Sequence, residues 1–302
     1  ELVELLRILG DPTRLRLLLT LRRGELTVGE ITRVTGLSQP RVSRHLKLLC
    51  DVHVLQRTRD QNEVYYRATA DKDRNQLVQE ALSCLPDNDP EIAQDRNRLI
   101  EILDSRQTRA RELLAELGVT PLDTAAIKEV KKIVEKLLQG RLPDKTLFGD
   151  LLDIGTGTGS MLQLLAQRAT RAVGVDHSRE MRLVARARVS LEGLTNCTVR
   201  DGDMYNLSFP QQSFDIVTMD RVLGTADRLH DALKQAASVL KNDGHLLVVE
   251  APGSPINQEN IGAWVTNAGL TPVEVIQSSN GALLIALATR STITSRQAIN
   301  GH

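Results

Sequence analysis

The sequence predicts two successive folding modules, an α+β module at the front and an α/β module behind it. Short helical patterns followed by one pair of alternating strands predict the first module, within residues 1–85. Strands that alternate with helices predict the second, within residues 148–290, as a mostly parallel seven-stranded sheet ending in an antiparallel hairpin. With 302 residues, the chain is long enough to bury two separate cores.

Charge is spread unevenly along a chain whose formal net charge is zero. Residues 1–70 hold 12 lysines and arginines against 8 aspartates and glutamates, whereas residues 149–290 hold 12 against 15. A basic front joined to an acidic remainder indicates contact with nucleic acid in the front module alone.

The three cysteines, Cys50, Cys84 and Cys197, are an odd number without C-x-x-C spacing. They favour a reducing, cytoplasmic location over a disulfide framework. No apolar run approaches the roughly 20 residues that a membrane span needs, and the first residues do not have the pattern of a signal peptide. We therefore expect no membrane partner.

The front module begins with helical patterns over residues 2–9 and 13–23. Thr27 and Glu30 have the spacing of a capping box, which predicts a short helix through Val34. Gly36 makes the turn that follows this helix.

A further helix follows, with Ser38 as its cap and an end near Cys50. Its buried stripe is Val42, Leu46 and Leu49, so its basic side chains must face elsewhere. Residues 52–59 and 64–68 then alternate as strands about a tip at residues 60–62, which predicts a hairpin.

This order of elements is typical of a winged helix–turn–helix, in which the second helix of the pair enters the major groove of DNA. The candidate DNA contacts are polar or basic residues of that helix and of the hairpin: Ser38, Gln39, Arg41, Ser43, Arg44, Lys47, Arg57, Arg59 and Gln61. The alternative is a solvated helix face without a partner. The helix order, the turn residues and the basic hairpin together favour double-stranded DNA.

Residues 9–16 (Leu-Gly-Asp-Pro-Thr-Arg-Leu-Arg) and 37–46 resemble the ArsR/SmtB family of bacterial repressors, as do residues 65–67. The resemblance covers about residues 1–84 and implies a homodimer built on the first helix and the helix after the hairpin, residues 71–85. A dimer of this kind binds an inverted-repeat operator.

One departure from the family concerns metals. Its metal-sensing members carry a cysteine pair where this chain has Glu25–Ile31, which contains no cysteine, and the helix at 71–85 has no histidine. Because a closed zinc or arsenic site needs three or four N or S ligands, we expect no metal. Residues 86–147 are expected to form a helical linker, and residues 291–302 a tail.

The second module opens with a strand and a glycine-rich turn, Leu151–Gly159, followed by a helix from Thr158 to Arg168. Glycines at 155, 157 and 159 let the backbone approach a ligand closely, and the helix directs its free N–H groups toward that ligand. A second strand ends at Asp176, where such folds place an acid against the hydroxyls of a ribose. The pattern predicts an adenosine-containing ligand.

The dinucleotide fingerprint G-x-G-x-x-G fails here, because position 160 is a serine. Residues 153–159 instead resemble motif I of the class I S-adenosylmethionine (SAM) methyltransferases. Residues 173–181, 201–210, 214–217 and 239–246 resemble later elements of that family in order. The ligand implied is SAM or its product S-adenosylhomocysteine (SAH).

The resemblance assigns the amino-acid part of the ligand to Asp153 and the glycine-rich backbone, the ribose to Asp176, and the adenine to Asp203 and Met204. Met181 would cover the adenine ring, and Asp220 would lie beside the sulfonium. The full set of cofactor-binding candidates is Asp153, Gly155, Thr156, Gly157, Thr158, Gly159, Asp176, His177, Met181, Gly202, Asp203, Met204 and Asp220.

No catalytic residue can be assigned, because Met219-Asp220-Arg221-Val222 lacks the element typical of nucleic-acid amino methyltransferases. Only residues 251–270 lie between the fifth and sixth strands, which leaves little room for a substrate cap. Two hypotheses are favoured over a third, which is DNA methylation guided by the winged helix. One is a repressor whose operator affinity is controlled by SAM or SAH; the alternative is a bifunctional repressor carrying an active small-molecule methyltransferase. In the first, coupling between the modules would run through the helices of residues 86–140.

Overall fold

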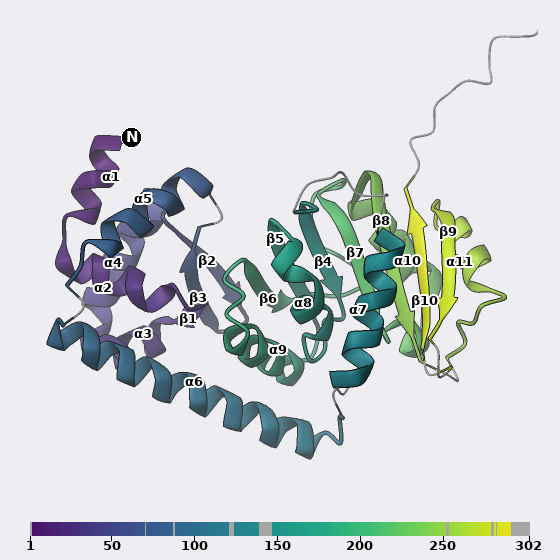
Figure 1. Ribbon diagram of the computed structural model, residues 1–302, viewed down its shortest axis with the longest axis horizontal. Coiled ribbons are helices and arrows are strands. Elements are labelled where there is room, and N and C mark those ends of the chain that lie inside the picture. The colour runs from purple at the N-terminus through teal and green to yellow at the C-terminus, as the bar shows by residue number, and fades with distance from the viewer. Residues whose placement is uncertain are drawn as a thin grey trace, which may run out of the picture. The chain divides into compact units, whose positions relative to one another are not determined.

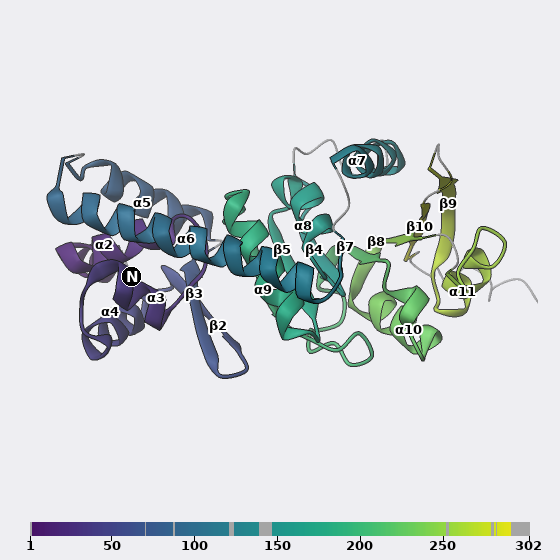
Figure 2. The same cartoon turned by 90° about the horizontal axis from the view of Figure 1, so that it is seen from below.

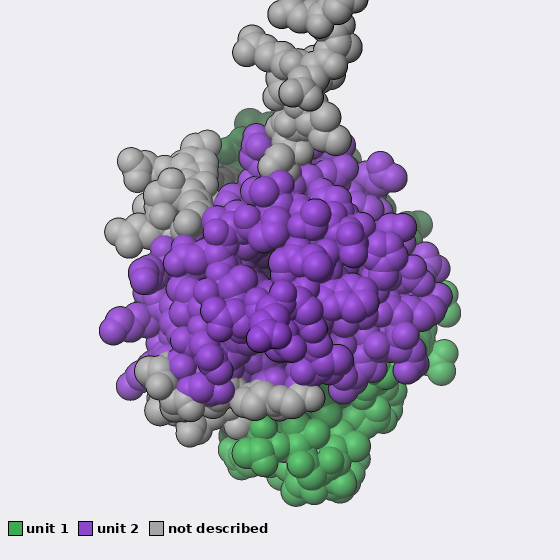
Figure 3. Space-filling view, turned by 90° about the vertical axis from the view of Figure 1, so that its right-hand side faces the viewer, with its two compact units in different colours: residues 1–121, 157–167, 177–201 green, residues 122–156, 168–176, 202–302 purple. Residues whose placement is uncertain are grey.

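The computed structural model describes residues 2–69, 71–86, 88–120, 124–138, 147–251, 254–278, 281 and 283–290 (Figure 1). The predicted tail, residues 291–302, lies outside these residues. The chain divides into two compact units (Figure 3). Unit 1 contains residues 1–121, 157–167 and 177–201, and unit 2 contains residues 122–156, 168–176 and 202–302.

The first part of unit 1 is the predicted winged helix–turn–helix. Its elements are α1 (Leu2–Leu9), α2 (Pro12–Leu21), β1 (Leu26–Thr27), α3 (Val28–Thr35), α4 (Gln39–Asp51), β2 (Leu55–Asp60), β3 (Glu63–Ala68) and α5 (Lys72–Ser83). The three strands form an antiparallel sheet in the order β1-β3-β2. The predicted stripe of α4, Val42, Leu46 and Leu49, is fully buried.

Two details of the hairpin differ from the sequence prediction. The first strand begins at Leu55 rather than residue 52, because His53 adopts a left-handed φ of 56° and turns the chain as it leaves α4. Asp60, predicted at the tip, is instead the last residue of β2 and is buried, so that Gln61 and Asn62 alone make the turn. The wing tip is therefore shorter than expected.

The predicted capping box at the start of α3 is present. The Glu30 amide donates to Thr27 Oγ1 over 3.2 Å, and the Thr27 amide donates to the Glu30 carboxylate over 2.8 Å. Ser38 occupies the N-cap position of α4, but its side chain makes no capping hydrogen bond.

This contrast gives a matched pair of variants. Thr27→Ala removes a capping acceptor and is expected to lower the free energy of unfolding by about 1 kcal/mol. Ser38→Ala removes no such bond and is expected to cost clearly less. Urea unfolding of both variants measures the difference, and equal losses would contradict this account of the two caps.

The helix α6 (Pro90–Glu116) has a continuous buried stripe, although its many charged residues give no clear core face in the sequence. The buried positions are Ile92, Asp95, Leu99, Ile102, Ala110 and Leu113. Asp95 accepts two hydrogen bonds from Arg16, each 2.8 Å long, and Arg106 on the same helix pairs with Glu30 at 2.6 Å. Figures 1 and 2 both show α6 passing along α3 and then α9 (Arg179–Leu191), within unit 1.

The second module has the predicted Rossmann-like fold. Its strands are β4 (Asp150–Ile154), β5 (Arg171–Asp176), β6 (Cys197–Asp201), β7 (Phe214–Asp220), β8 (Leu240–Glu250), β9 (Thr271–Gln277) and β10 (Leu284–Thr289). The sheet order is β6-β5-β4-β7-β8-β10-β9, and β10 pairs antiparallel with both of its neighbours. The predicted seven-stranded sheet with a C-terminal antiparallel hairpin is thereby confirmed.

The remaining helices precede or connect these strands. They are α7 (Thr124–Leu138), α8 (Ser160–Leu165) with the 3-10 turn η1 (Ala166–Arg168), α9, the 3-10 turn η2 (Leu223–Thr225), α10 (Leu229–Val239) and α11 (Ile261–Asn267). The helix predicted from Thr158 begins two residues later, because Gly159 serves as its N-cap with a left-handed φ of 77°. In the described part of the chain, no helix has both the length and the apolarity to cross a membrane.

Candidate DNA interface and ligand site

The helix α4 presents its predicted DNA-contacting residues to solvent. Five of the six are exposed, and only Ser43 is half-buried: the exposed ones are Ser38, Gln39, Arg41, Arg44 and Lys47. Arg41 donates through Nη2 to the Thr13 hydroxyl over 3.2 Å, which ties its guanidinium to α2. The face opposite the buried stripe is therefore polar, basic and accessible.

The wing carries the other three predicted contacts. Arg57, Arg59 and Gln61 are exposed, and Arg59 Nε donates to the Gln61 carbonyl oxygen over 3.1 Å. Gln61 has a φ of 52°, as a tight two-residue turn requires. The structure thus places three exposed potential donors to a DNA backbone along β2 and at the hairpin turn.

A buried cluster of charges lies behind the wing tip, and no sequence motif reveals it. Arg182 contacts both carboxylate oxygens of Asp60, at 3.1 Å and 2.9 Å. Arg186 donates to Asp60 over 2.6 Å and to Glu25 over 2.8 Å, and its guanidinium carbon lies 4.0 Å from the centroid of the Tyr65 ring. All of these residues belong to unit 1.

Burial and pairing act in opposite directions on the two carboxyl groups of this cluster. Burial raises the pKa of Glu25, against the opposing effect of Arg186. Burial also tends to raise the pKa of Asp60, but hydrogen bonds and charge from Arg182 and Arg186 outweigh it and leave that pKa lowered. Asp60 is therefore held as a carboxylate inside the protein.

In unit 2, the predicted carboxylate of motif I is fixed by two hydroxyl groups. Asp153 is almost fully buried, accepting a 2.6 Å hydrogen bond from Thr156 and a 2.7 Å bond from Thr218. Burial raises the pKa of Asp153 to about 7, and the negative charges of Asp220 and Asp176 add to this effect, while the two hydroxyls oppose it. A cation bound next to Asp153 would lower this pKa and so favour the carboxylate form.

The raised pKa predicts a pH dependence of stability. The folded protein holds the Asp153 proton more tightly than the unfolded chain does, so this contribution is complete below about pH 4. It is lost as the pH rises through about 7. The loss in free energy of unfolding is expected to be on the order of a few kcal/mol.

Urea unfolding of the ligand-free protein between pH 4 and pH 8 measures this effect. Asp153→Asn, which has no proton to lose, should remove that part of the slope. An unchanged slope in the variant would contradict the assignment.

Asp176 lies where the sequence places the ribose acid, as the buried last residue of β5. The Gly202 amide donates to the Asp176 carbonyl oxygen over 3.3 Å, and a Cβ at Gly202 would lie 2.8 Å from the Val175 Cβ. Only glycine allows the chain after β6 to approach β5 so closely. The next residues form a tight turn, in which Asp203 Oδ1 accepts from the Tyr205 amide over 2.9 Å and Met204 is half-buried.

At the end of β7, the carboxylate of Asp220 is paired with the next residue along the chain. Asp220 forms two parallel 2.9 Å hydrogen bonds with Arg221, which adopts a left-handed φ of 55°. Glu250, the last residue of β8, accepts from the Leu223 and Gly224 amides over 2.9 Å and 3.2 Å, and burial raises its pKa. Arg221 and Glu250 are not among the predicted site residues. Glu250 could have been found from the sequence, because Asp176, Asp220 and Glu250 each end a strand of the sheet.

Unit 1 holds five of the predicted ligand residues: Gly157, Thr158, Gly159, His177 and Met181. Gly157 and Gly159 have φ values of 49° and 77°, and the hydroxyl of Thr158 lies 3.0 Å from that of Ser160. His177 is exposed, and the half-buried Met181 lies in the first turn of α9. Gly155, which belongs to unit 2, has a φ of 65°, and a Cβ on it would collide with Val222.

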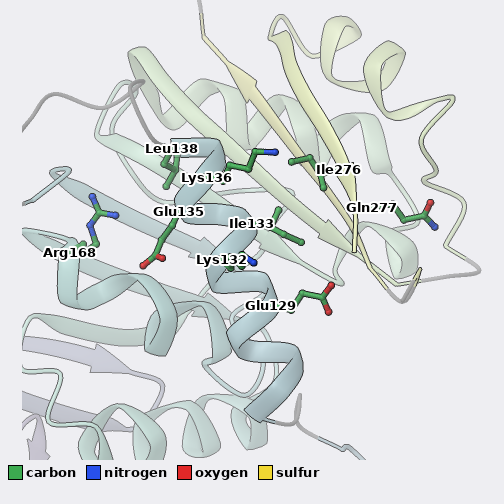
Figure 4. A pocket seen from close by; sticks show the side chains of 9 residues that line it. All are labelled: Glu129, Lys132, Ile133, Glu135, Lys136, Leu138, Arg168, Ile276 and Gln277. Atoms are coloured by element: carbon green, nitrogen blue, oxygen red, sulfur yellow. The ribbon is translucent and has the colours of Figure 1, made fainter. Parts of the chain in front are cut away.

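A separate groove of about 790 Å³ lies in unit 2, and none of the predicted ligand residues lines it (Figure 4). Lys132 and Lys136 of α7 line it together with Arg168 and Ile276. Within the described ranges, no three side chains of His, Cys, Asp or Glu are placed to hold a metal ion.

Comparison with known proteins places each module in a family. Residues 11–52 match the model of bacterial regulatory proteins of the arsR family, and residues 152–248 match the model of a methyltransferase domain. The chain therefore joins an ArsR-family helix–turn–helix region to a methyltransferase domain.

Individual relatives match one module each. An uncharacterized methyltransferase of Bacillus subtilis is 33% identical over 111 residues, which are 36% of this chain and 44% of that protein. The biofilm growth-associated repressor of Xylella fastidiosa is 36% identical over 72 residues, which are 24% of this chain and 63% of that protein. The chain thus spans less than two thirds of the length of these two relatives.

A solved structure shows the same fold. The crystal structure of the 4+2 cyclase SpnF superposes with a TM-score of 0.51 and 16% identity, covering 61% of this chain and 93% of that chain. At this identity the likeness concerns the fold alone.

Proposed function

We propose that this chain, an ArsR-family helix–turn–helix region joined to a methyltransferase domain, is a DNA-binding transcriptional repressor controlled by SAM or SAH. The ligand binds at the carboxyl ends of the parallel strands and changes the affinity of the protein for its operator. The bacterial cytoplasm is the place where such a regulator would meet both DNA and ligand.

The DNA-binding part of the proposal rests on the accessible basic face of α4 and on the exposed wing residues. The duplex would receive α4 in its major groove and the wing against the adjacent backbone. Arg44 and Lys47 lie on the exposed side of α4, away from the buried stripe.

A second copy of the chain would complete the operator-binding form. The helix α1 leaves Leu2, Val3 and Leu6 exposed by 60%, 80% and 51% of their surfaces. Three large apolar side chains on one short helix favour burial against the same helix of a partner, which is an isologous dimer interface. Such a dimer has the two-fold symmetry of an inverted-repeat operator.

The observation that carries the ligand part is the placement of acids around the first parallel strands. Asp176 is buried at the end of β5, and Asp153 and Asp220 lie near enough for their charges to interact. Because Gly202 has no Cβ, the chain there can lie close to the end of β5. The buried Asp176 carboxylate next to it suits the two hydroxyls of a ribose. The carboxylate form of Asp153 suits an α-ammonium group, and the positive charge of that group would oppose the effect of burial on the Asp153 pKa.

The rival function is an active small-molecule methyltransferase, and its support is the complete set of ligand-binding positions. Two contacts count against a methyltransferase activity. Arg221 donates a hydrogen bond to the Asp220 carboxylate, and the backbone amides of η2 donate to Glu250. These contacts leave neither acid as an obvious base for an acceptor. The fold itself does not decide, because related folds serve different reactions.

Isothermal titration of the full chain with SAM and with SAH tests the proposal. Binding of SAH as tight as that of SAM, or tighter, supports a sensor. A clear preference for SAM favours the enzyme and calls for a screen of methyl acceptors. If neither compound binds, the proposed ligand is wrong.

Arg44→Ala tests the DNA interface. The variant is expected to bind its operator roughly tenfold more weakly, because a charged contact to a base edge or phosphate is lost. Affinity should be measured at several salt concentrations on a duplex that the full chain selects from a random library. Arg109→Ala, at an exposed ion pair of α6, is the control and should bind normally. An unchanged affinity of Arg44→Ala for the operator would contradict the proposed contact between α4 and DNA.

A further inference from the structure

One buried side chain of unit 1 contacts three segments that the proposed function treats separately. The guanidinium of Arg182, which has no exposed surface, pairs with both oxygens of Asp60 in the wing. Its Nη1 donates to the carbonyl oxygen of His177 over 3.0 Å and lies 2.9 Å from Asp201 Oδ1. A planar guanidinium with five N–H groups is the side chain suited to several partners in fixed directions.

Two of these partners adjoin the proposed ligand-binding residues along the chain. His177 directly follows Asp176, the proposed ribose acid, and Asp201 directly precedes Gly202 and Asp203 of the adenine-side loop. A backbone change at either of these proposed ligand-binding segments would therefore reach a partner of Arg182.

The third partner lies at the DNA end. Asp60 is the last residue of β2 and stands between Arg59 and Gln61, both of which we propose to contact DNA. If the position of Asp60 shifts, the exposed residues on either side of it shift as well. The wing tip is thus attached to α9 through a charge pair rather than lying free in solvent.

Arg186, one helical turn after Arg182, adds further hydrogen bonds that restrain the wing against α9. It donates to Glu25 over 2.8 Å, to Asp60 over 2.6 Å and to the Val199 carbonyl oxygen over 2.6 Å. Glu25 adjoins β1, and Val199 lies in β6. Since charges buried in this way must keep their partners, the cluster has few alternative arrangements.

We propose that Arg182, supported by Arg186, is the residue that couples nucleoside binding to the wing. This inference rests on the proposed function and specifies how it is regulated. A bound ligand fixes the segments that follow β5 and β6. The Arg182 guanidinium moves with these segments because it is bonded to His177 and Asp201. Asp60 moves with the guanidinium and sets the orientation of Arg59 and Gln61. Arg182 is a positioning residue, because it acts on ligand and DNA only through these partners. The route is direct and differs from the one expected from the sequence, which ran through the helices between the modules.

Hydrogen–deuterium exchange of the full chain, with and without SAH, tests the coupling and does not require an identified operator. In the wild-type protein, saturating SAH is expected to slow amide exchange of residues 55–68 roughly fivefold or more. Arg182→Lys keeps the charge but cannot reproduce the fork of donors. This variant should still bind SAH by calorimetry while the response of the wing falls below about twofold. Arg179→Lys, at an exposed arginine of the same helix, is the matched control and should respond like wild type.

The possible outcomes separate this inference from the proposed function. SAH binding without any change in the wing, or an undiminished change in Arg182→Lys, overturns the coupling and leaves the ligand site standing. Absence of SAH and SAM binding overturns the proposed ligand. In that event, amide exchange of the two variants without ligand tests the role of Arg182. Faster exchange of both 55–68 and 177–181 in Arg182→Lys than in Arg179→Lys supports the link, and a change in only one segment refutes it.

Discussion

Asp176→Ala is expected to weaken SAH binding by ~100-fold or more. The carboxylate is buried at the end of β5, and we propose that it accepts hydrogen bonds from both ribose hydroxyls. Hydrogen bonds to a charged group contribute ~1.5–3 kcal/mol each, and an alanine would also leave the hydroxyls without partners in a water-poor site. Neither SAM nor SAH should compensate, because both carry the same ribose.

Calorimetric titration of wild type and variant with SAH measures the loss. Asp231→Ala, at an exposed aspartate of α10 in the same unit, is the control and should bind normally. Circular dichroism should show that both variants are folded. If Asp176→Ala binds SAH like wild type, the ligand does not lie at the end of β5.

Arg186→Ala is expected to produce the largest loss of stability, about 3–5 kcal/mol in the free energy of unfolding. The change removes the guanidinium that faces Glu25 and Asp60 and that stacks on Tyr65. Glu25 would remain buried without its principal counter-charge, which costs far more than losing an exposed pair.

Urea unfolding compares Arg186→Ala with Arg109→Ala, which removes an exposed ion pair of α6 and should leave stability unchanged. The double variant Glu25→Leu, Arg186→Met should recover part of the loss, because it removes the unpaired charge as well. Equal stability of Arg186→Ala and wild type would mean that the cluster does not hold unit 1 together.

The local features of the fold could be predicted from the sequence because they depend on nearby residues. The capping box of Thr27 and Glu30, the turn at Gly36 and the glycine turn at 155–159 each require a residue type at a fixed spacing. The structure has all of them at the expected positions. The sequence likewise predicts a C-terminal antiparallel hairpin, which β9 and β10 form.

The largest group of missed features involves charged residues that are buried with distant partners. Arg182 and Arg186 look like a solvated helix face in the sequence, since their partners Asp60 and Glu25 lie 122 and 161 residues away. Asp95 and Arg106 interrupt the apolar stripe of α6 in the same way. Periodicity treats each such residue as exposed, so only the tertiary pairing identifies it.

The central claim is that SAM or SAH changes the affinity of this protein for its operator. The most direct test measures the dissociation constant of the full chain for its selected operator duplex, without ligand, with saturating SAM and with saturating SAH. We expect at least one of the two compounds to shift the constant roughly fivefold or more, and the shift to vanish in Asp176→Ala. An operator affinity that stays the same under all three conditions would contradict the account.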